Sequence, residues 1–236
     1  MRYAVRLPAE FQPEAPVVVD LSNHRPSQLA FRLSDSSAAL VAECIFPPHA
    51  VLGSVSAAGH DLIVSSERAV PGGWEVDGGF GRMLLAVSAT APGEPLPLSR
   101  WHLRHIEETT MAGVAYRARP LPEVVADCEF SVVGGSVQVL HRVQNDGKSR
   151  VCVTLATSLA VGSTAAGIGS NDLRLEWQVD DGAMTVELAR TPGIAVRADP
   201  AEPASCFGFR YPAEGCVELA PGMIAEVRYE LRARRR

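Results

Sequence analysis

The stretch that decides the fold is Val137-Gln138-Val139-Leu140-His141-Arg142-Val143, in which apolar and polar side chains largely alternate. Residues 173–179 and 225–231 repeat this alternation. Because successive side chains of a β-strand point to opposite faces, a period of two is typical of strands with one buried and one solvated face. Turn residues separate such runs about every ten residues, which favours a sandwich or barrel over an α/β fold. The sequence therefore predicts an all-β protein with a large antiparallel β-sandwich.

Three turns between these runs are marked by glycine and aspartate. They are Gly134-Gly135, Asn145-Asp146-Gly147 and Asp180-Asp181-Gly182. Asp-Gly between two alternating runs is a strong hairpin signal, since both residues tolerate the backbone of a tight turn. We therefore expect residues 124–190 to form a continuous antiparallel meander. The glycine-rich stretches 71–81 and 162–171 are expected to be loops.

Length and composition indicate one globular domain. The chain has 236 residues, of which 47% are hydrophobic and 21% charged, enough apolar side chains for a single large core. We expect residues 1–236 to form one β-sandwich domain, with residues 1–35 as an N-terminal strand-and-loop extension. The net charge of -5 gives no electrostatic reason to expect nucleic acid or a membrane surface as partner. Without a signal-peptide pattern or a long apolar run, the chain is expected to be cytoplasmic.

Five cysteines are spread widely and form no Cys-x-x-Cys pair: Cys44, Cys128, Cys152, Cys206 and Cys216. A structural zinc site needs clustered ligands, and a disulfide framework usually shows an even number of cysteines. The pattern therefore predicts neither a metal nor a disulfide, and a reduced protein without a cofactor. Cysteines in strand-like runs are instead expected to pack as small apolar side chains.

A set of short segments follows one another in a family-like order. The segments are Ala38–Phe46, Gly53-Ser54-Val55, Gly59–Ile63, Val139–Gly147 followed by Val151–Leu155, and Leu219-Ala220-Pro221-Gly222. In this order, and in the Asn-x-Gly turn at residues 145–147, the chain resembles the galactose mutarotase-like superfamily, whose members include aldose 1-epimerases. The resemblance implies a supersandwich fold, a sugar ligand, and a sugar site entered by the strand that follows the turn.

The same resemblance shows where the chain departs from the family. Epimerases of this family carry a histidine, the general acid, on the strand after the turn, whereas residues 154–160 contain none. Their glutamate base has only loose counterparts in Glu202, Glu214 and Glu218. Ring-opening epimerisation needs an acid and a base on one sugar. The fold is therefore expected without the family's full acid–base pair.

The densest group of polar residues runs from Arg100 to Glu108. On a strand, one face would carry Arg100, His102, Arg104 and Glu108, and the other would carry Trp101 and Leu103 toward the core. Arginines offer paired donors to a carboxylate or phosphate, and histidine exchanges a proton near neutral pH. We assign His102 and Glu108 to catalysis and the two arginines to substrate binding. The alternative is a solvated face of cross-strand ion pairs.

Two further residues complete the candidate site. Trp74, within the glycine-rich stretch, has an indole that suits the apolar face of a sugar ring, although it could equally plug the end of the sandwich. His141 is a second candidate for substrate binding. It lies in phase with the valines of its strand, so the alternative is a core histidine.

Three functions follow from these patterns. The first is a carbohydrate-active protein, epimerase-like or lyase-like, that takes a small sugar or carboxylate ligand. The second is a non-catalytic sugar-binding or assembly module, consistent with the missing histidine. The third is a structural subunit that forms a homo-oligomer through an exposed strand edge.

Overall fold

The computed structural model describes residues 4–5, 17–19, 29–34, 40–46, 51–70, 73–88, 95–96, 101–108, 111–162, 166–171, 173–180, 182–198 and 206–235. Every regular element in these ranges is a β-strand, and all the paired strands are antiparallel. The predicted all-β antiparallel fold is therefore confirmed. No helix within the described ranges is long and apolar enough to span a membrane.

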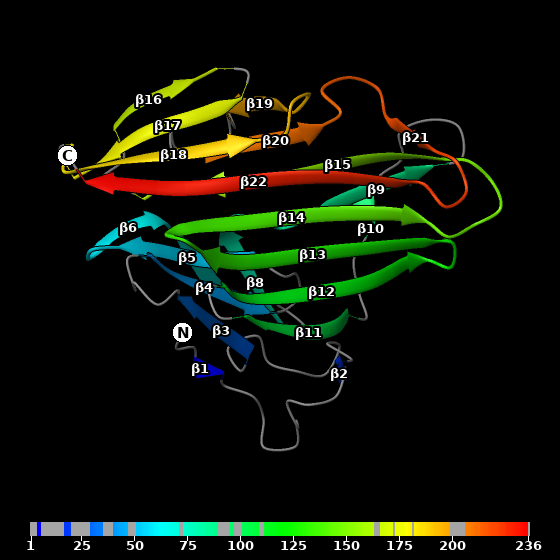
Figure 1. Ribbon diagram of the computed structural model, residues 1–236, viewed down its shortest axis with the longest axis horizontal. Helices are drawn as coiled ribbons and strands as arrows, with labels where there is room; N and C mark the ends of the chain where they lie inside the picture. Colours follow the sequence, from blue (N-terminus) through cyan, green and yellow to red (C-terminus); the bar gives the residue numbers. More distant parts are fainter. Residues whose placement is uncertain are drawn as a thin grey trace.

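One layer is a nine-stranded sheet, which runs across the front of Figure 1. In spatial order its strands are β16 (Ala166–Ser170), β17 (Arg174–Val179), β18 (Met184–Arg190), β22 (Ile224–Arg235), β14 (Ser136–Asn145), β13 (Val124–Val133), β12 (Met111–Leu121), β11 (Trp101–Glu108) and β2 (Val17–Val19). The three alternating stretches of the sequence contribute β14, β17 and β22, and each buries the predicted face.

The other layer is built from two smaller sheets. The five-stranded sheet contains β1 (Ala4–Val5), β3 (Leu29–Ser34), β4 (Leu40–Phe46), β5 (Val51–Ala57) and β6 (His60–Ile63). The six-stranded sheet contains β10 (Pro95–Leu96), β9 (Leu84–Ser88), β15 (Val151–Ala160), β20 (Cys206–Tyr211) and β19 (Ala195–Ala198), with β21 (Val217–Leu219) also paired to β15. A separate ribbon pairs β7 (Ser65–Val70) with β8 (Gly73–Gly78).

The segment Gly79–Gly81 joins the two smaller sheets into one layer. Leu52 and Phe80 exchange two backbone hydrogen bonds of 2.8 and 2.9 Å, and the N–H of Ala160 donates to the carbonyl of Gly79 at 2.9 Å. Strands β5 and β15 are therefore bridged through this segment. Only glycine fits at position 79, because its φ is +73° and a Cβ there would lie 2.5 Å from the carbonyl oxygen of Leu52.

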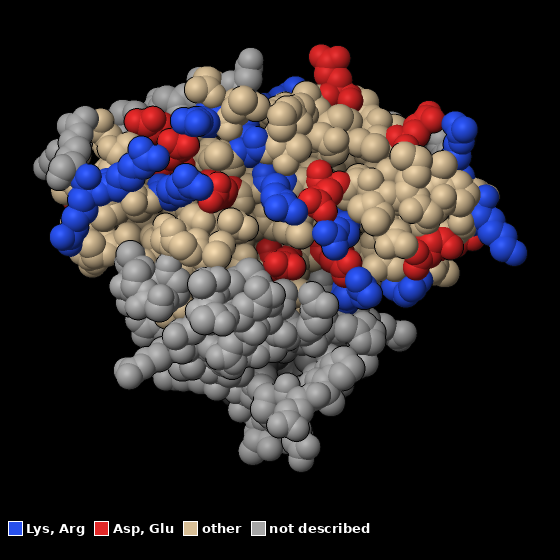
Figure 2. All heavy atoms as spheres, viewed as in Figure 1, with Lys and Arg blue, Asp and Glu red and all other residues tan. Residues whose placement is uncertain are grey.

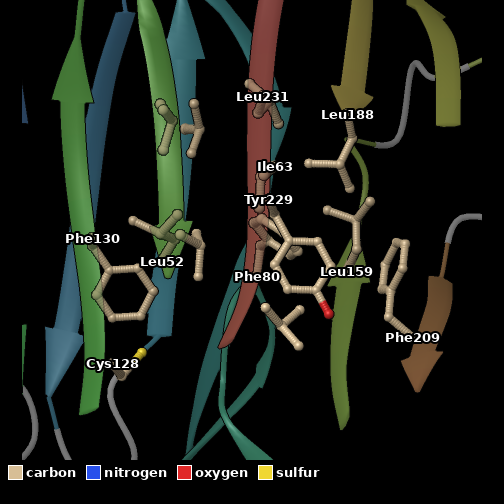
Figure 3. Close-up of a cluster of buried hydrophobic side chains, with 14 of the residues drawn as sticks. Leu52, Ile63, Phe80, Cys128, Phe130, Leu159, Leu188, Phe209, Tyr229 and Leu231 are labelled. Atoms are coloured by element: carbon tan, nitrogen blue, oxygen red, sulfur yellow. The ribbon is translucent and has the colours of Figure 1, made fainter. Parts of the chain in front are cut away.

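The core lies between the layers and forms a continuous apolar cluster. Phe80 is fully buried at its centre, with its ring edge-to-face against Tyr229 of β22 at 5.4 Å and against Phe209 of β20 at 6.3 Å. Figure 3 shows these three rings side by side between the strands. Aromatic pairs in this arrangement gain energy beyond the apolar area that they bury.

The expected continuous meander over residues 124–190 is wrong. The hairpins β13–β14 and β17–β18 form as predicted, but β15 pairs with β9 and β20 in the opposite layer, and β22 lies beside β14 instead. The turn at Asn145 therefore crosses between layers. The buried side chain of Asn145 holds this crossing, with its Nδ2 donating to the carbonyls of Ser149 and Leu219 and its Oδ1 accepting from the N–H of Gly147.

Two other expectations also need correction. The stretches 71–81 and 162–171 are not simply loops, because each contains a strand, β8 and β16 respectively. The expectation of no disulfide is wrong, since Cys152 on β15 is bonded to Cys216, with the two Cα atoms 5.6 Å apart. Cys216 lies immediately before β21, which pairs with β15, so the bridge spans neighbouring strands that sequence spacing does not connect.

Replacing Gly79 by alanine tests the joining segment. Gly59 is the matched control, since its φ is +87° but a Cβ at that position would have no atom within 4 Å. We expect Gly59→Ala to lower the free energy of unfolding by about 1–2 kcal/mol through the left-handed backbone alone. Gly79→Ala should lower it by roughly 3–5 kcal/mol, because the overpacking against Leu52 is added. Equal losses in urea unfolding would contradict a tight approach at Gly79.

Candidate functional site

The predicted polar strand exists as β11, residues 101–108, so three of its four candidates, His102, Arg104 and Glu108, lie on one strand. Arg100 lies outside the described residues. Strand β11 pairs with β12 along its whole length and with β2 at residues 101–103. The backbone register places each candidate on β11 opposite a residue of β12.

Cross-strand register identifies the face to which the candidates belong. Residues directly opposite one another share a face of the sheet. The row that begins at His102 continues through Arg117, Asp127, Arg142 and Glu226. The next row begins at Leu103 and continues through Tyr116, Cys128, His141 and Val227.

The two rows differ completely in burial. The side chains of Arg117, Asp127, Arg142 and Glu226 are exposed or half-buried, whereas Cys128, His141 and Val227 have no exposed surface. By backbone pairing, His102 therefore continues the row whose described side chains lie on the outer face of the nine-stranded sheet, and Leu103 continues the row whose described side chains face the core. The strand phase that the sequence predicts for the side chains of β11 stays a prediction.

The outer face carries several ion pairs. Arg117 donates from Nε and Nη2 to the two carboxylate oxygens of Asp127 at 2.7 and 2.9 Å. Arg142 and Arg228 both donate to Glu226, at distances from 2.8 to 3.1 Å. The hydrogen bond from Arg142 is the main reason that the pKa of Glu226 is lowered. Figure 2 shows acidic and basic side chains interspersed over this face.

Trp74 lies on β8 in the two-stranded ribbon, with its Cα opposite Ala69. It is thus on a different sheet from β11. The structure does not bring its backbone into the row of His102, so its predicted role in stacking on a sugar ring stays a prediction.

His141 occupies the core between the layers. Its ring is 0% exposed, its Nε2 donates to the carbonyl of Gly81 at 2.8 Å, and it packs edge-to-face on Tyr229 at 5.9 Å. Burial lowers its pKa to about 4, so the ring is neutral at pH 7 with the proton on Nε2. The alternative of a core histidine fits this environment, and a ligand contact would require entry into the core.

The strand that the resemblance assigns to the sugar is β15, which lies in the layer opposite β11. Its outer row consists of Ser158, Gly208 and Arg197 on three neighbouring strands. Ser158 and Arg197 are exposed, and none of the described hydrogen bonds or ion pairs involves the Arg197 guanidinium. Sequence analysis missed this row because its members come together only through long-range strand pairing.

The loose glutamate counterparts do not converge on this row. Glu214 is exposed in the turn whose carbonyls at Pro212, Ala213 and Gly215 accept hydrogen bonds from Arg210. Glu218, on β21, lies 3.6 Å from Arg150 in an exposed ion pair. Glu202 lies outside the described residues. Within the described ranges, no three His, Cys, Asp or Glu side chains are grouped to hold a metal ion.

The chain is similar to known proteins in structure but not in sequence. No family model and no curated protein sequence matches the chain. Among solved structures, Slr1438 from Synechocystis sp. PCC 6803 matches with a TM-score of 0.63 and 11% identity over 93% of this chain and 100% of its own. A galactose mutarotase-like protein from Clostridium acetobutylicum matches with a TM-score of 0.58 and 8% identity over 88% of this chain and 95% of its own.

A larger enzyme contains the same architecture. Heparinase III matches with a TM-score of 0.54 and 11% identity over 88% of this chain and 34% of its own. At identities this low, the similarity establishes the fold alone. The chain therefore has the galactose mutarotase-like supersandwich fold, as the order of its segments suggested.

The buried His141 predicts a specific dependence of stability on pH. Above pH 6.5 the histidine is neutral in both states, and below it the unfolded chain takes up a proton that the folded chain excludes until about pH 4. The free energy of unfolding should therefore fall by roughly 3 kcal/mol between these values on account of this residue.

The control variant is His141→Gln, which keeps an N–H donor for Gly81 and does not titrate. Its baseline stability should be lower, but its loss between pH 6.5 and 4 should be smaller than that of the wild type. Urea unfolding across this pH range measures the free energy of unfolding of both proteins. Parallel pH curves would show that His141 is not buried as a neutral ring.

Proposed function

We propose that this protein binds, or acts on, a sugar that carries an acidic group, and that the outer face of β11 supplies the cationic contacts. The observation that supports the proposal is the backbone pairing of His102 with Arg117, an exposed residue of the polar outer row. Arg104 has the same parity as His102 along β11, so strand geometry assigns it to the same face. Arg100 lies outside the described residues and keeps the substrate-binding role predicted from the sequence. The fold, shared with a galactose mutarotase-like protein and with heparinase III, supports a carbohydrate ligand.

Strand geometry favours binding over epimerisation by the predicted catalytic pair. His102 and Glu108 are separated by six residues of β11, or roughly 20 Å at the rise of an extended strand. A single sugar ring is much shorter, so these residues would not act as acid and base on the same ring. Residues 154–160 of β15 contain no histidine to replace the family's acid. His102 is therefore proposed as an anion contact that can exchange a proton, and catalysis remains a prediction.

There are two alternatives. The protein is a non-catalytic assembly subunit, or it binds the sugar on the opposite layer. The exposed Ser158 and Arg197 on the outer face of the six-stranded sheet favour the latter, because the Arg197 guanidinium is available to a ligand. Cytoplasmic localisation also belongs to the proposal, although a disulfide such as Cys152–Cys216 is uncommon in reducing compartments.

Titration calorimetry with D-galacturonate, and with D-galactose as the neutral counterpart, tests the proposal. The acidic sugar should bind more tightly than the neutral one. Arg104→Ala should weaken binding by about ten- to a hundredfold, the usual effect of losing one charge-assisted contact. Arg174→Ala is the control, because this exposed arginine pairs with Glu187 near the other edge of the same sheet.

The variant Arg197→Ala distinguishes the two layers. Under the proposal it binds galacturonate as the wild type does. If Arg197→Ala loses affinity while Arg104→Ala keeps it, the ligand lies on the six-stranded sheet and the assignment to β11 fails. If the wild type binds neither sugar, the carbohydrate proposal is wrong and the assembly function is favoured.

A further inference from the structure

Arg117 is the described side chain that stands directly opposite the predicted site. Its Cα pairs with that of His102, one strand away from β11. Its side chain is 60% exposed, compared with 23% for its partner Asp127. The guanidinium is therefore open to solvent on the face that we assign to the ligand, while the carboxylate beneath it is largely covered.

The pairing with Asp127 uses only part of the guanidinium. The Nε and Nη2 atoms each donate to one carboxylate oxygen, and no described hydrogen bond uses Nη1. A guanidinium is a rigid planar fork, so holding one edge fixes the direction of the remaining donors. A second anion can be bound through Nη1 without breaking the ion pair.

We propose that Arg117 is a further cation of the acidic-sugar site, and that Asp127 is a positioning residue that holds the guanidinium ready for the ligand. This inference rests on the proposed function. It adds a contact from β12 to those of β11, so that the sugar carboxylate is bound across two neighbouring strands. Preorganisation of this kind improves affinity because less side-chain freedom is lost when the ligand binds.

A purely structural ion pair would behave differently. Exposed salt bridges contribute little to stability, so the Arg117–Asp127 pair alone gives no reason for a large effect of either residue on folding. Under our proposal the two residues act together on affinity, and the effect of Asp127 depends on the presence of Arg117. This dependence distinguishes a residue that positions Arg117 for the ligand from one that only forms a surface ion pair.

Galacturonate titration of Arg117→Ala, Asp127→Asn and the double variant forms the test. We expect Arg117→Ala to bind roughly tenfold more weakly, as for the loss of a charge-assisted hydrogen bond, and Asp127→Asn about three- to fivefold more weakly. The double variant should bind no more weakly than Arg117→Ala alone, since Asp127 acts through the arginine. Urea unfolding should change little in any of the three.

The matched control is Arg142→Ala. Arg142 also pairs with a carboxylate through Nε and Nη2 on the outer face, but its strand lies three strands away from β11. It should leave affinity unchanged. If Arg104→Ala loses affinity and Arg117→Ala does not, this inference is wrong and the proposed function stands. If the losses of binding free energy in Arg117→Ala and Asp127→Asn add up in the double variant, Asp127 is not a positioning residue. If the wild type does not bind, both proposals fall.

Discussion

The Gly79–Gly81 segment is hydrogen-bonded to both layers of the sandwich. On one side its backbone bonds to Leu52 and Ala160, which belong to separate sheets. On the other side the carbonyl of Gly81 accepts a hydrogen bond from His141 of the nine-stranded sheet. The ring of Phe80 fills the space between the layers. Glycine at both ends permits this approach, because a Cβ at position 81 would lie 2.7 Å from the ring of Phe130.

The buried contact at Gly81 also shows how the outer face is oriented. His141 points into the core together with the valines of its strand and binds Gly81 there, so its neighbour Arg142 on β14 points out. The same phase passes through register from β14 to β13, β12 and β11, since a shift by one residue would turn every side chain to the other face. The assignment of His102 to the outer row therefore depends on the packing of the core. The position of a candidate site on β11 therefore depends on contacts in the core, away from the outer face.

Local patterns in the sequence predict much of this architecture, and tertiary pairing decides the rest. Alternation identifies β14, β17 and β22, and the phase of β11 follows from the same period of two. The turn at Asn145 carries a hairpin signal, but its side chain bonds to Leu219, which is distant in the sequence. The sequence alone does not say that β22 takes the place beside β14, because that pairing runs from Ser136 with Arg232 to Gln144 with Ile224, residues that are distant in the chain.

The same limit applies to the candidate site. The group from Arg100 to Glu108 is visible because its charges are consecutive, whereas Arg117 and Asp127 are recognised as a pair only once β12 and β13 are in register. Ser158 and Arg197 come together across Gly208 in the same way. The Cys152–Cys216 bridge likewise depends on the pairing of β21 with β15, so cysteine spacing gave no sign of it.

Hydrogen exchange at the backbone amides of Phe80 and Ala160 tests most directly whether this segment holds the sandwich together. Both amides donate across the junction, to Leu52 and Gly79 respectively. If the junction between the two smaller sheets opens only when the whole protein unfolds, the free energy of exchange at both amides equals the free energy of global unfolding, as for the central strand β14. Exchange at Phe80 and Ala160 through a much smaller free energy, with β14 still protected, would show that the junction opens independently and would contradict this account.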